Sequence, residues 1–409
     1  MVRGLGRDVA VTAMIMGGSA LGDAAAQVAL VLRVHEDGGS AWAVTALLLA
    51  GALSAVFSAR PAGAMVDRYD SRVLMVGCAL LQAVVCLPLA VSSSIGVLVV
   101  LVAGLTGLAT VADPARTALV PDMVGPRHLL RANAVLRGAT ATGRMAGWPL
   151  GGFLTGMLGS GSVLLLDAVS FAVLAAGAMV IRTRRVPGPA SGPRSHGGVR
   201  VWVDGTVDPV LTLVAGSVAL VLLFVSSTNV AQVFFVKDVL GVSDTGYGVV
   251  GACWMVGMVL AVPLVAPGRC TRGALATLVV AGEAVTGVAV LGAGLSSSPV
   301  MVGVWYLLAG LGSSSMMIAG AALVGLVAPG EARGRVLAAY STLANVGMAA
   351  ALGLSVVLMG WLGARGVFLA AGALTVMAAT LAAGVLRSRR ENVRGMRSSK
   401  GIAKYRPVS

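Results

Sequence analysis

The stretch that decides the fold is a charged turn between two apolar runs, in which residues 63–72 read Gly-Ala-Met-Val-Asp-Arg-Tyr-Asp-Ser-Arg. Apolar residues dominate 41–59 before this turn and 73–91 after it, and each run is close to the ~20 residues that a helix needs to cross a bilayer. The same alternation of apolar runs and short polar turns continues in both directions along the chain. The turn therefore indicates a polytopic membrane protein.

Composition excludes the other broad classes of protein. Of the 409 residues, 57% are hydrophobic and only 11% are charged, whereas a soluble domain carries about 25% charged residues. Disordered chains are poor in apolar residues, and this chain has no ten-residue alternating pattern of the kind found in outer-membrane barrels. The four cysteines have no metal-ligand spacing. We expect an all-α membrane protein without a metal site or a cofactor.

Twelve apolar runs can each form a membrane-spanning helix. We predict spans at 9–32, 41–59, 73–91, 95–112, 134–157, 161–181, 209–235, 246–267, 273–294, 299–325, 337–360 and 366–386. The first run resembles a secretory signal because Arg3 and Arg7 precede it, but it continues past Asp23 to Leu32. We therefore expect it to span the membrane uncleaved.

Basic residues predict the orientation of these spans. With a cytoplasmic N-terminus, 25 Lys and Arg residues fall in cytoplasmic segments and 3 (Arg33, Lys237 and Arg365) fall in outer loops. This split follows the positive-inside rule and places both termini in the cytoplasm. The net charge of +14 has the same origin, because the basic residues contact anionic lipids at the cytoplasmic surface. It does not indicate binding of nucleic acid. The excess of Arg over Lys is typical of high-GC bacteria, so we expect a bacterial plasma membrane.

A polar linker rich in Pro, Gly and Arg divides six predicted spans from six others. We predict an N-terminal bundle at 1–182, a cytoplasmic linker at 183–208, a C-terminal bundle at 209–386 and a basic cytoplasmic tail without regular structure at 387–409. Leu119-Val120-Pro121 has an echo in the second half at 326–329, which supports a duplicated transporter architecture. We expect a monomer.

The turn at 63–72 resembles the signature G-x-x-x-D-R-x-G-R-R of the major facilitator superfamily. Gly63, Asp67, Arg68 and Arg72 match, whereas Asp70 and Ser71 depart from the pattern. Other segments resemble the enterobactin-exporter-like and macrolide-efflux-like branch. These are Leu21-Gly22-Asp23, Asp113-Pro114-Ala115-Arg116, Ala118 to Pro121, Leu130 to Ala134, Asp167-Ala168-Val169-Ser170-Phe171, Gly246-Tyr247-Gly248 and Arg333-Gly334-Arg335-Val336.

The resemblance implies two six-helix bundles and secondary active transport by alternating access. It implies proton-coupled efflux, as an antiporter, of a small amphipathic molecule such as a drug, an antibiotic or a siderophore. An importer or facilitator of a small metabolite and a non-transporting membrane sensor remain alternatives. An enzyme is not expected, because an intramembrane hydrolase needs a base within a span, and His35, His128 and His196 all fall in predicted loops.

The signature residues are expected to act as a conformational switch. Glycine permits close helix approach, and a carboxylate at a helix end is stabilised by the N-terminus of another helix. We therefore expect Asp67 to meet the segment around Arg333 when the cytoplasmic side is closed. The predicted switch residues are Gly63, Asp67, Arg68, Arg72, Arg333 and Arg335.

Polar residues inside spans are functional candidates, because a charge at a helix centre costs about 2.5–3.5 kcal/mol on insertion scales. The proton-coupling candidates are Asp23 and Glu283, and the cavity-polar candidates are Gln27, Asn229, Gln232 and Arg144. Asp23 and Gln27 are four residues apart and share a helix face. For Glu283 an interhelical hydrogen bond is favoured, and Asp167 is expected to cap a helix or to pair.

Two features of the middle spans depart from related proton antiporters. Gly147, Pro149, Gly151 and Gly152 resemble the G-P-x-x-G-G motif with its proline moved by one position, and we expect a bend there. The predicted fourth span, 95–112, lacks the arginine that many such antiporters carry. Proton coupling therefore has to be assigned to other residues.

Overall fold

The computed structural model describes residues 6–181, 183, 209–265, 271–327 and 333–402, and all regular elements within these ranges are helical. The helices are α1 (Arg7–Glu36), α2 (Ala41–Arg68), α3 (Ser71–Val91), α4 (Ile95–Leu158), α5 (Ser160–Val180), α7 (Pro209–Ser226), α8 (Thr228–Phe234), the π-helix η1 (Phe235–Val239), α9 (Asp244–Val265), α10 (Arg272–Leu295), α11 (Pro299–Val327) and α12 (Arg333–Ile402). Ten helical segments in these ranges are long and apolar enough to cross a membrane. The chain is a multi-pass membrane protein.

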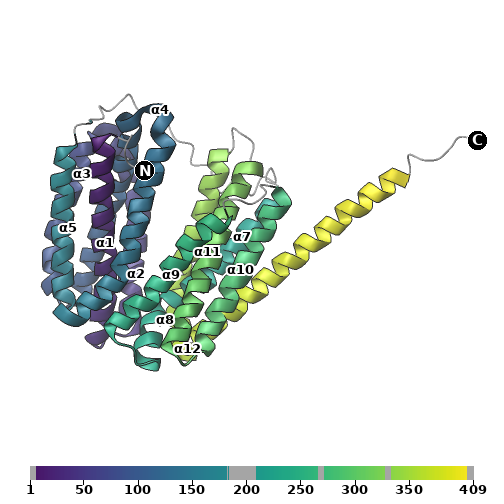
Figure 1. Ribbon diagram of the computed structural model, residues 1–409. Coiled ribbons are helices and arrows are strands. Elements are labelled where there is room, and N and C mark those ends of the chain that lie inside the picture. Colours follow the sequence, from purple (N-terminus) through teal and green to yellow (C-terminus); the bar gives the residue numbers. More distant parts are fainter. Residues whose placement is uncertain (1–5, 182, 184–208, 266–270, 328–332, 403–409) are drawn as a thin grey trace, which may run out of the picture.

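The helices form two groups, α1–α5 and α7–α12, as Figure 1 shows. The groups contact each other mainly through α4 with α9 and through α2 with α12. In Figure 1 they lie close together at the end opposite the N-terminus and diverge toward the end at which the N-terminus lies. The two halves therefore meet at one end of the molecule.

Helix α4 contains two of the predicted spans. Its 64 residues would extend about 96 Å if straight, about three times the thickness of the bilayer core. The part of α4 near Gly147 lies against Leu21 of α1, and Gly151 lies against Ala25, so this part runs parallel to α1. The earlier part runs parallel to α2, because Ser54 contacts the carbonyl of Ala103 and Ser58 lies against Gly107. Since α1 and α2 are joined by a short loop and run in opposite directions, α4 reverses its course.

The predicted loop at 113–133 is wrong, because these residues are helical within α4. Hydropathy marks the residues that face lipid, whereas helix continuity depends on backbone propensity, which Ala, Leu, Arg and Met favour. The same reason explains the basic tail, which was expected to lack regular structure. Helix α12 continues through it to Ile402 and projects away from the second group in Figure 1.

A glycine separates the two predicted spans within α12. Gly363 has φ 65° and ψ 175°, a left-handed conformation that only glycine adopts without strain. Before it, Ser355 donates a hydrogen bond to the carbonyl of Ser227 at 2.7 Å, while beyond it Gly372 packs against Leu291 of α10. The chain thus turns at Gly363 and contacts a different helix on each side.

The outer surface is apolar and the interior is built from small residues. Phe57, Val100, Val300 and Trp361 have exposed fractions of 75%, 70%, 78% and 84%, which suits lipid contact and not contact with water. In a bilayer, helices associate through close packing of small residues. Some glycines accordingly lie where helix backbones touch, such as Gly143 against Gly17 O and Gly257 against Leu307 O.

Two arginines at the end opposite the N-terminus bind helix carbonyls. Arg33 Nη1 donates to Leu89 O at 3.2 Å and to Ala90 O at 2.8 Å, at the last turn of α3. Arg365 Nη2 donates to Ser296 O at 3.4 Å, at the end of α10. A cation at a helix C-terminus satisfies carbonyls that lack a helical partner and interacts favourably with the helix dipole.

The contact between α1 and α4 predicts opposite effects for two glycines on α4. A Cβ at Gly147 would lie 2.5 Å from Leu21 O and 2.7 Å from the Cβ of Ala24, whereas one at Gly138 would meet no described heavy atom within 4 Å. We expect Gly147→Ala to destabilise the protein by about 1–3 kcal/mol through overpacking. Gly138→Ala should be neutral or stabilise by up to about 1 kcal/mol through helix propensity.

Thermal unfolding of the purified full-length variants in one detergent measures this difference. A lower Tm for Gly147→Ala with an unchanged or higher Tm for Gly138→Ala is the expected result. Equal Tm values for the two variants would contradict the assigned packing of α1 on α4.

Candidate functional site

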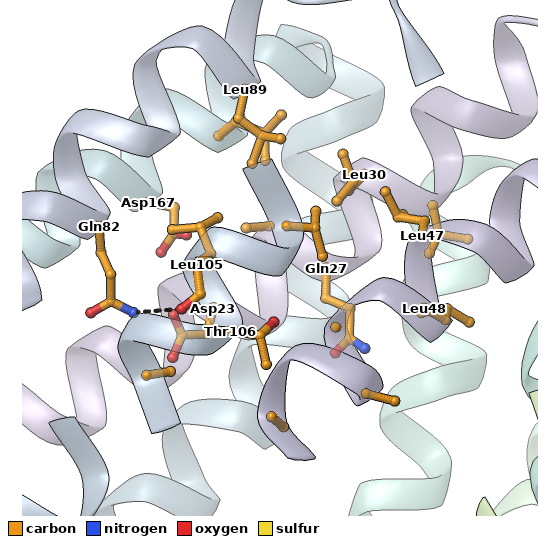
Figure 2. A pocket seen from close by; sticks show the side chains of 18 of the residues that line it. Asp23, Gln27, Leu30, Leu47, Leu48, Gln82, Leu89, Leu105, Thr106 and Asp167 are labelled. Atoms are coloured by element: carbon orange, nitrogen blue, oxygen red, sulfur yellow. Dashed lines mark hydrogen bonds between the residues drawn. The ribbon is translucent and has the colours of Figure 1, made fainter. Parts of the chain in front are cut away.

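A cavity of about 410 Å³ lies within the first group of helices, between α1, α2, α3, α4 and α5. We call it the N-half cavity. Figure 2 shows Asp23, Asp167 and Gln82 on one side of it and Leu47 and Leu48 on the other. The cavity therefore has a polar side and an apolar side within one helix group.

Asp23 and Gln27 both line the N-half cavity, as their i, i+4 spacing on α1 predicts. Both side chains are exposed to the cavity, while the neighbours Ala24 and Ala26 are buried. The positive charges of Arg116 and Arg144 and the negative charge of Asp113 act on Asp23. Asp23 is thus an accessible carboxyl group with both signs of charge nearby.

Arg116 lies on α4 just beyond the predicted end of the fourth span. The apolar helical segment runs from Ile95 to Val124, twelve residues beyond the predicted end at 112, and so includes Arg116. Its side chain is only 11% exposed and its Nη1 lies 3.2 Å from Asp113 Oδ1, one turn earlier on α4. Residues 95–112 carry no charge, so Arg116 is a basic group near the end of this helical segment and not an arginine in its middle.

Asp167 is a cavity residue that sequence reasoning did not assign to the site. It lies inside α5, eight positions into a helix that begins at Ser160, so it does not cap the helix. Its side chain is 4% exposed, Ser170 Oγ donates to its Oδ1 at 3.0 Å, and Cys86 Sγ donates to its Oδ2 at 3.8 Å. The resemblance of residues 167–171 to a family segment was the available signal.

Asn229 and Gln232 do not line the N-half cavity. Both lie on the short helix α8, where Asn229 is exposed and Gln232 is 8% exposed. The amide nitrogen of Gln232 has no hydrogen-bond partner among the described residues. Asn229 and Gln232 therefore do not share the N-half cavity with Asp23 and Gln27.

Glu283 lies in the second group of helices, away from Asp23. It is fully buried on α10 and accepts a hydrogen bond at Oε1 from Ser217 Oγ of α7, at 2.7 Å. This is the kind of interhelical hydrogen bond that its position in the ninth predicted span favoured. Its Oε2 has no partner among the described residues.

The signature turn is shorter than predicted. Helix α2 continues to Arg68 and α3 begins at Ser71, so only Tyr69 and Asp70 separate the two helices. Asp70, which departs from the family pattern, accepts a hydrogen bond from the backbone N–H of Arg72 at 2.7 Å and caps α3. Capping of α3 therefore explains why aspartate is favourable at this position, where glycine is usual in the family pattern.

The contacts of Arg72 and Gly63 differ from those expected for the signature turn. Arg72 Nε donates to Ala178 O at 3.1 Å and its Nη2 donates to Met179 O, so it binds the last turn of α5 and not a carboxylate. A Cβ at Gly63 would meet no described atom within 4 Å, so the described residues show no close approach at this glycine. Arg68 is exposed. The side chains of Asp67, Arg333 and Arg335 lie outside the described residues.

The glycines predicted to bend the fifth span provide close packing on two sides. A Cβ at Gly151 would lie 2.6 Å from the Cα of Ala25 on α1, and one at Gly152 would lie 3.0 Å from the Cα of Gly248 on α9. The backbone is helical through Pro149, which is partly buried. These residues therefore join α1 and α9, from the two halves of the protein, to one helix.

Charged residues connect the two halves at the end where they meet. His35 Nε2 of α1 lies 3.0 Å from Asp238 Oδ1 of η1, and the His35 ring packs edge-on against Phe234 at 5.1 Å between centroids. Beside this pair, Lys237 forms an ion pair with Asp244 at the start of α9. We call His35 and Asp238 the end pair.

The end pair predicts an energetic coupling between the halves. Its two side chains lie 3.0 Å apart, and Asp238 is 55% exposed; a partly exposed pair contributes about 0.2–1 kcal/mol. In a double-mutant cycle with His35→Gln and Asp238→Asn, we expect a coupling energy in this range. Thermal unfolding of the four purified proteins in one buffer measures it, and strictly additive effects of the two replacements would contradict the contact.

The chain matches proteins of one family over nearly its whole length. The family model of the Major Facilitator Superfamily matches residues 12–236 and 214–407. No curated protein sequence matches the chain. The described residues contain no group of three or more His, Cys, Asp or Glu side chains that could hold a metal ion.

Several solved transporter structures have the same fold. The nucleoside transporter NupG superposes with a TM-score of 0.76 at 11% identity, over 93% of this chain and 99% of that one. A bacterial homologue of the human lysosomal transporter Spinster, inward-facing and unoccupied, has a TM-score of 0.72 at 13% identity, over 93% and 96%. A POT family transporter in complex with 5-aminolevulinic acid has a TM-score of 0.73 at 12% identity, over 92% and 95%. At these identities the likeness establishes the fold alone.

Proposed function

Because the chain belongs to the Major Facilitator Superfamily, we propose that it is a secondary active transporter that exports a small amphipathic molecule in exchange for protons by alternating access. The substrate is a drug, an antibiotic or a siderophore, in line with the enterobactin-exporter-like and macrolide-efflux-like resemblance. The proposal includes twelve spans in two six-helix bundles, at 1–182 and 209–386, with the linker and both termini in the cytoplasm of a bacterium.

The N-half cavity is the single observation that carries the proposal. Its volume of about 410 Å³ falls within the range of about 300–1,000 Å³ typical of small-molecule sites. Carboxyl and amide groups occupy one side, and leucine, valine and alanine side chains occupy the rest. An amphipathic molecule matches such a lining, because its apolar part leaves water while its polar part keeps hydrogen bonds.

Asp23 is the proposed coupling residue, because it is accessible from the cavity and lies on the first span. One proton that moves down one pH unit yields ~1.4 kcal/mol, and one charge that crosses 100 mV yields ~2.3 kcal/mol. The sum of ~3.7 kcal/mol sustains a roughly 500-fold gradient of a neutral substrate at one proton for each molecule. Coupling through a single carboxyl group is therefore sufficient for effective export.

The arrangement of the halves supports entry of substrate from the cytoplasm. The two groups of helices diverge toward the end at which the N-terminus lies, which the charge distribution assigns to the cytoplasmic side. We propose that this conformation is inward-open and that the contacts between α4 and α9 close the outer side. The end pair then belongs to the outer closure.

An importer or facilitator is the alternative within transport. NupG is a nucleoside transporter by name, so the same fold also serves metabolite transport. A facilitator equilibrates its substrate in both directions without a pH gradient, whereas an antiporter accumulates substrate only when the gradient is imposed. A non-transporting sensor shows no flux of any probe.

We expect Asp23→Asn to abolish uphill, pH-driven transport and to retain downhill exchange, because the variant keeps the shape of the site but cannot release a proton. Inside-out vesicles with an imposed pH gradient measure accumulation of three probes, ethidium, erythromycin and enterobactin. Asp122→Asn is the matched control, since Asp122 is exposed on α4 and does not line the N-half cavity. Wild-type accumulation in Asp23→Asn would make Asp23 structural and Glu283→Gln the next variant to test.

A second prediction concerns the signature turn. We expect Asp67→Asn to slow transport at least ~10-fold without loss of expression, because the carboxylate stabilises closure of the cytoplasmic side against the helix that begins near Arg333, an interaction of about 1–2 kcal/mol. Initial rates in the same vesicles, normalised to protein content, measure the effect. Rates equal to those of the wild type would remove the proposed switch role.

A further inference from the structure

Two sequence motifs that are distant in the chain meet at the N-half cavity. Gly22, in Leu21-Gly22-Asp23 of α1, faces the segment 167–171 of α5. A Cβ at Gly22 would lie 2.5 Å from Asp167 Oδ1 and 2.6 Å from Ser170 Oγ. The absence of a side chain at position 22 therefore lets the carboxyl group of Asp167 reach α1 beside Asp23.

Asp23 and Asp167 are two like charges on one cavity. Both residues line the cavity, Asp23 from α1 and Asp167 from α5, and the contact of Gly22 with Asp167 Oδ1 brings this carboxyl group to the residue next to Asp23. Two carboxylates in one site of low polarity disfavour simultaneous ionisation, and the protons of such a pair belong to the pair rather than to either residue.

Asp167 has only neutral hydrogen-bond donors among the described residues that contact it. Ser170 and Cys86 supply these donors, at 3.0 Å and 3.8 Å. The positive charges that face the site come from α4, where Arg116 and Arg144 act on Asp23, and Arg116 already contacts Asp113. The described ion pairs do not include Asp167, so its charge is not balanced by direct contact with a basic group.

A buried amide group, that of Gln82, lies at the same cavity. It lies on α3, is 2% exposed and lines the N-half cavity. Its amide nitrogen donates to Leu105 O at a long 3.5 Å, and its Oε1 has no partner among the described residues. A buried amide oxygen without a donor is costly, and the O–H of a protonated carboxyl group is a donor of the kind that it lacks.

We propose that Asp23 and Asp167 bind one proton as a pair, with Gln82 as a hydrogen-bond acceptor at the same site, and that Asp167 is the second coupling residue of the transporter. The pair carries a charge of −2 without the proton and −1 with it. Loss of the proton to one side of the membrane and its recovery from the other balance the cycle. The assignment extends the proposed proton coupling and rests on it for its role in transport, whereas proton binding by the pair is testable without a substrate.

Difference infrared spectroscopy of the purified full-length protein in lipid tests the pair directly, because protonated carboxyl groups have a distinct carbonyl stretch. Wild type, Asp23→Asn, Asp167→Asn and the double variant are titrated with pH, and Asp122→Asn is the matched control. We expect each single replacement to move the titration midpoint of the remaining carboxyl group by about one pH unit or more. Asp122→Asn should leave both signals unchanged, and Asp167→Glu, which keeps the charge, should retain the coupling.

Unchanged midpoints in the single variants would overturn the pair. Asp23 faces the cavity, so Asp23→Asn is expected to fold, and its effect on the Asp167 signal decides the question even if Asp167→Asn does not fold. Gln82→Leu gives a second reading, because it removes the acceptor and should change the frequency of the protonated carboxyl signal. An identical frequency in this variant would remove Gln82 from the site.

Transport in inside-out vesicles separates this proposal from the proposed function. If the pair is correct, Asp23→Asn, Asp167→Asn and the double variant lose pH-driven accumulation of a transported probe to the same extent, because all three remove the same proton. If the infrared signals are coupled but every variant accumulates probe like the wild type, shared proton binding by the pair is confirmed and its role in transport is contradicted. If Asp23→Asn alone abolishes accumulation and the signals are independent, proton coupling through Asp23 is supported and shared proton binding with Asp167 is contradicted.

Discussion

The close contact between α1 and its two neighbours is the constraint on which the site depends. Gly147 and Gly151 let α4 approach the backbone of α1 on one side, and Gly22 admits Asp167 of α5 on the other. Because α1 packs against the backbone of α4 on one side and against the side chains of Asp167 and Ser170 of α5 on the other, its rotation is fixed. Asp23 and Gln27 therefore point into the N-half cavity and not toward lipid, and the cavity keeps its polar side.

The same packing connects the site to the other half of the protein. Gly152, one position after Gly151, packs against α9, so a single stretch of α4 contacts α1 and α9 at once. A movement of the second half is thereby transmitted to α1 through one rigid element rather than through a chain of side chains. In the proposed rocking of two bundles, this stretch of α4 would be the contact through which one half moves against the other.

Sequence reasoning located the helices well and their ends poorly. Apolar runs identify residues suited to lipid contact, so most of the long helices were predicted, but the helices continue through 113–133 and beyond Arg387, where polar and charged residues interrupt the apolar pattern. Arg116 lies in this continuation of α4, just past the polar interruption at Asp113 and Pro114. For the site, spacing along one helix was sufficient to group Asp23 with Gln27. Asp167 was missed because its contact with Gly22 joins residues 145 positions apart, and no periodicity along the chain reports such a contact.

The basic residues at the end opposite the N-terminus have a consequence for how the chain enters the membrane. Arg33 and Arg365 bind helix carbonyls, and Lys237 is paired with Asp244. These three are the residues that depart from the positive-inside pattern, and each has a partner within the fold. The partners of Arg33 and Lys237 follow them in the chain, whereas the partner of Arg365, at the end of α10, precedes it. In the proposed topology, with this end outside the cytoplasm, Arg33 and Lys237 therefore cross the membrane before their partners are in place, whereas Arg365 crosses after its partner has been made.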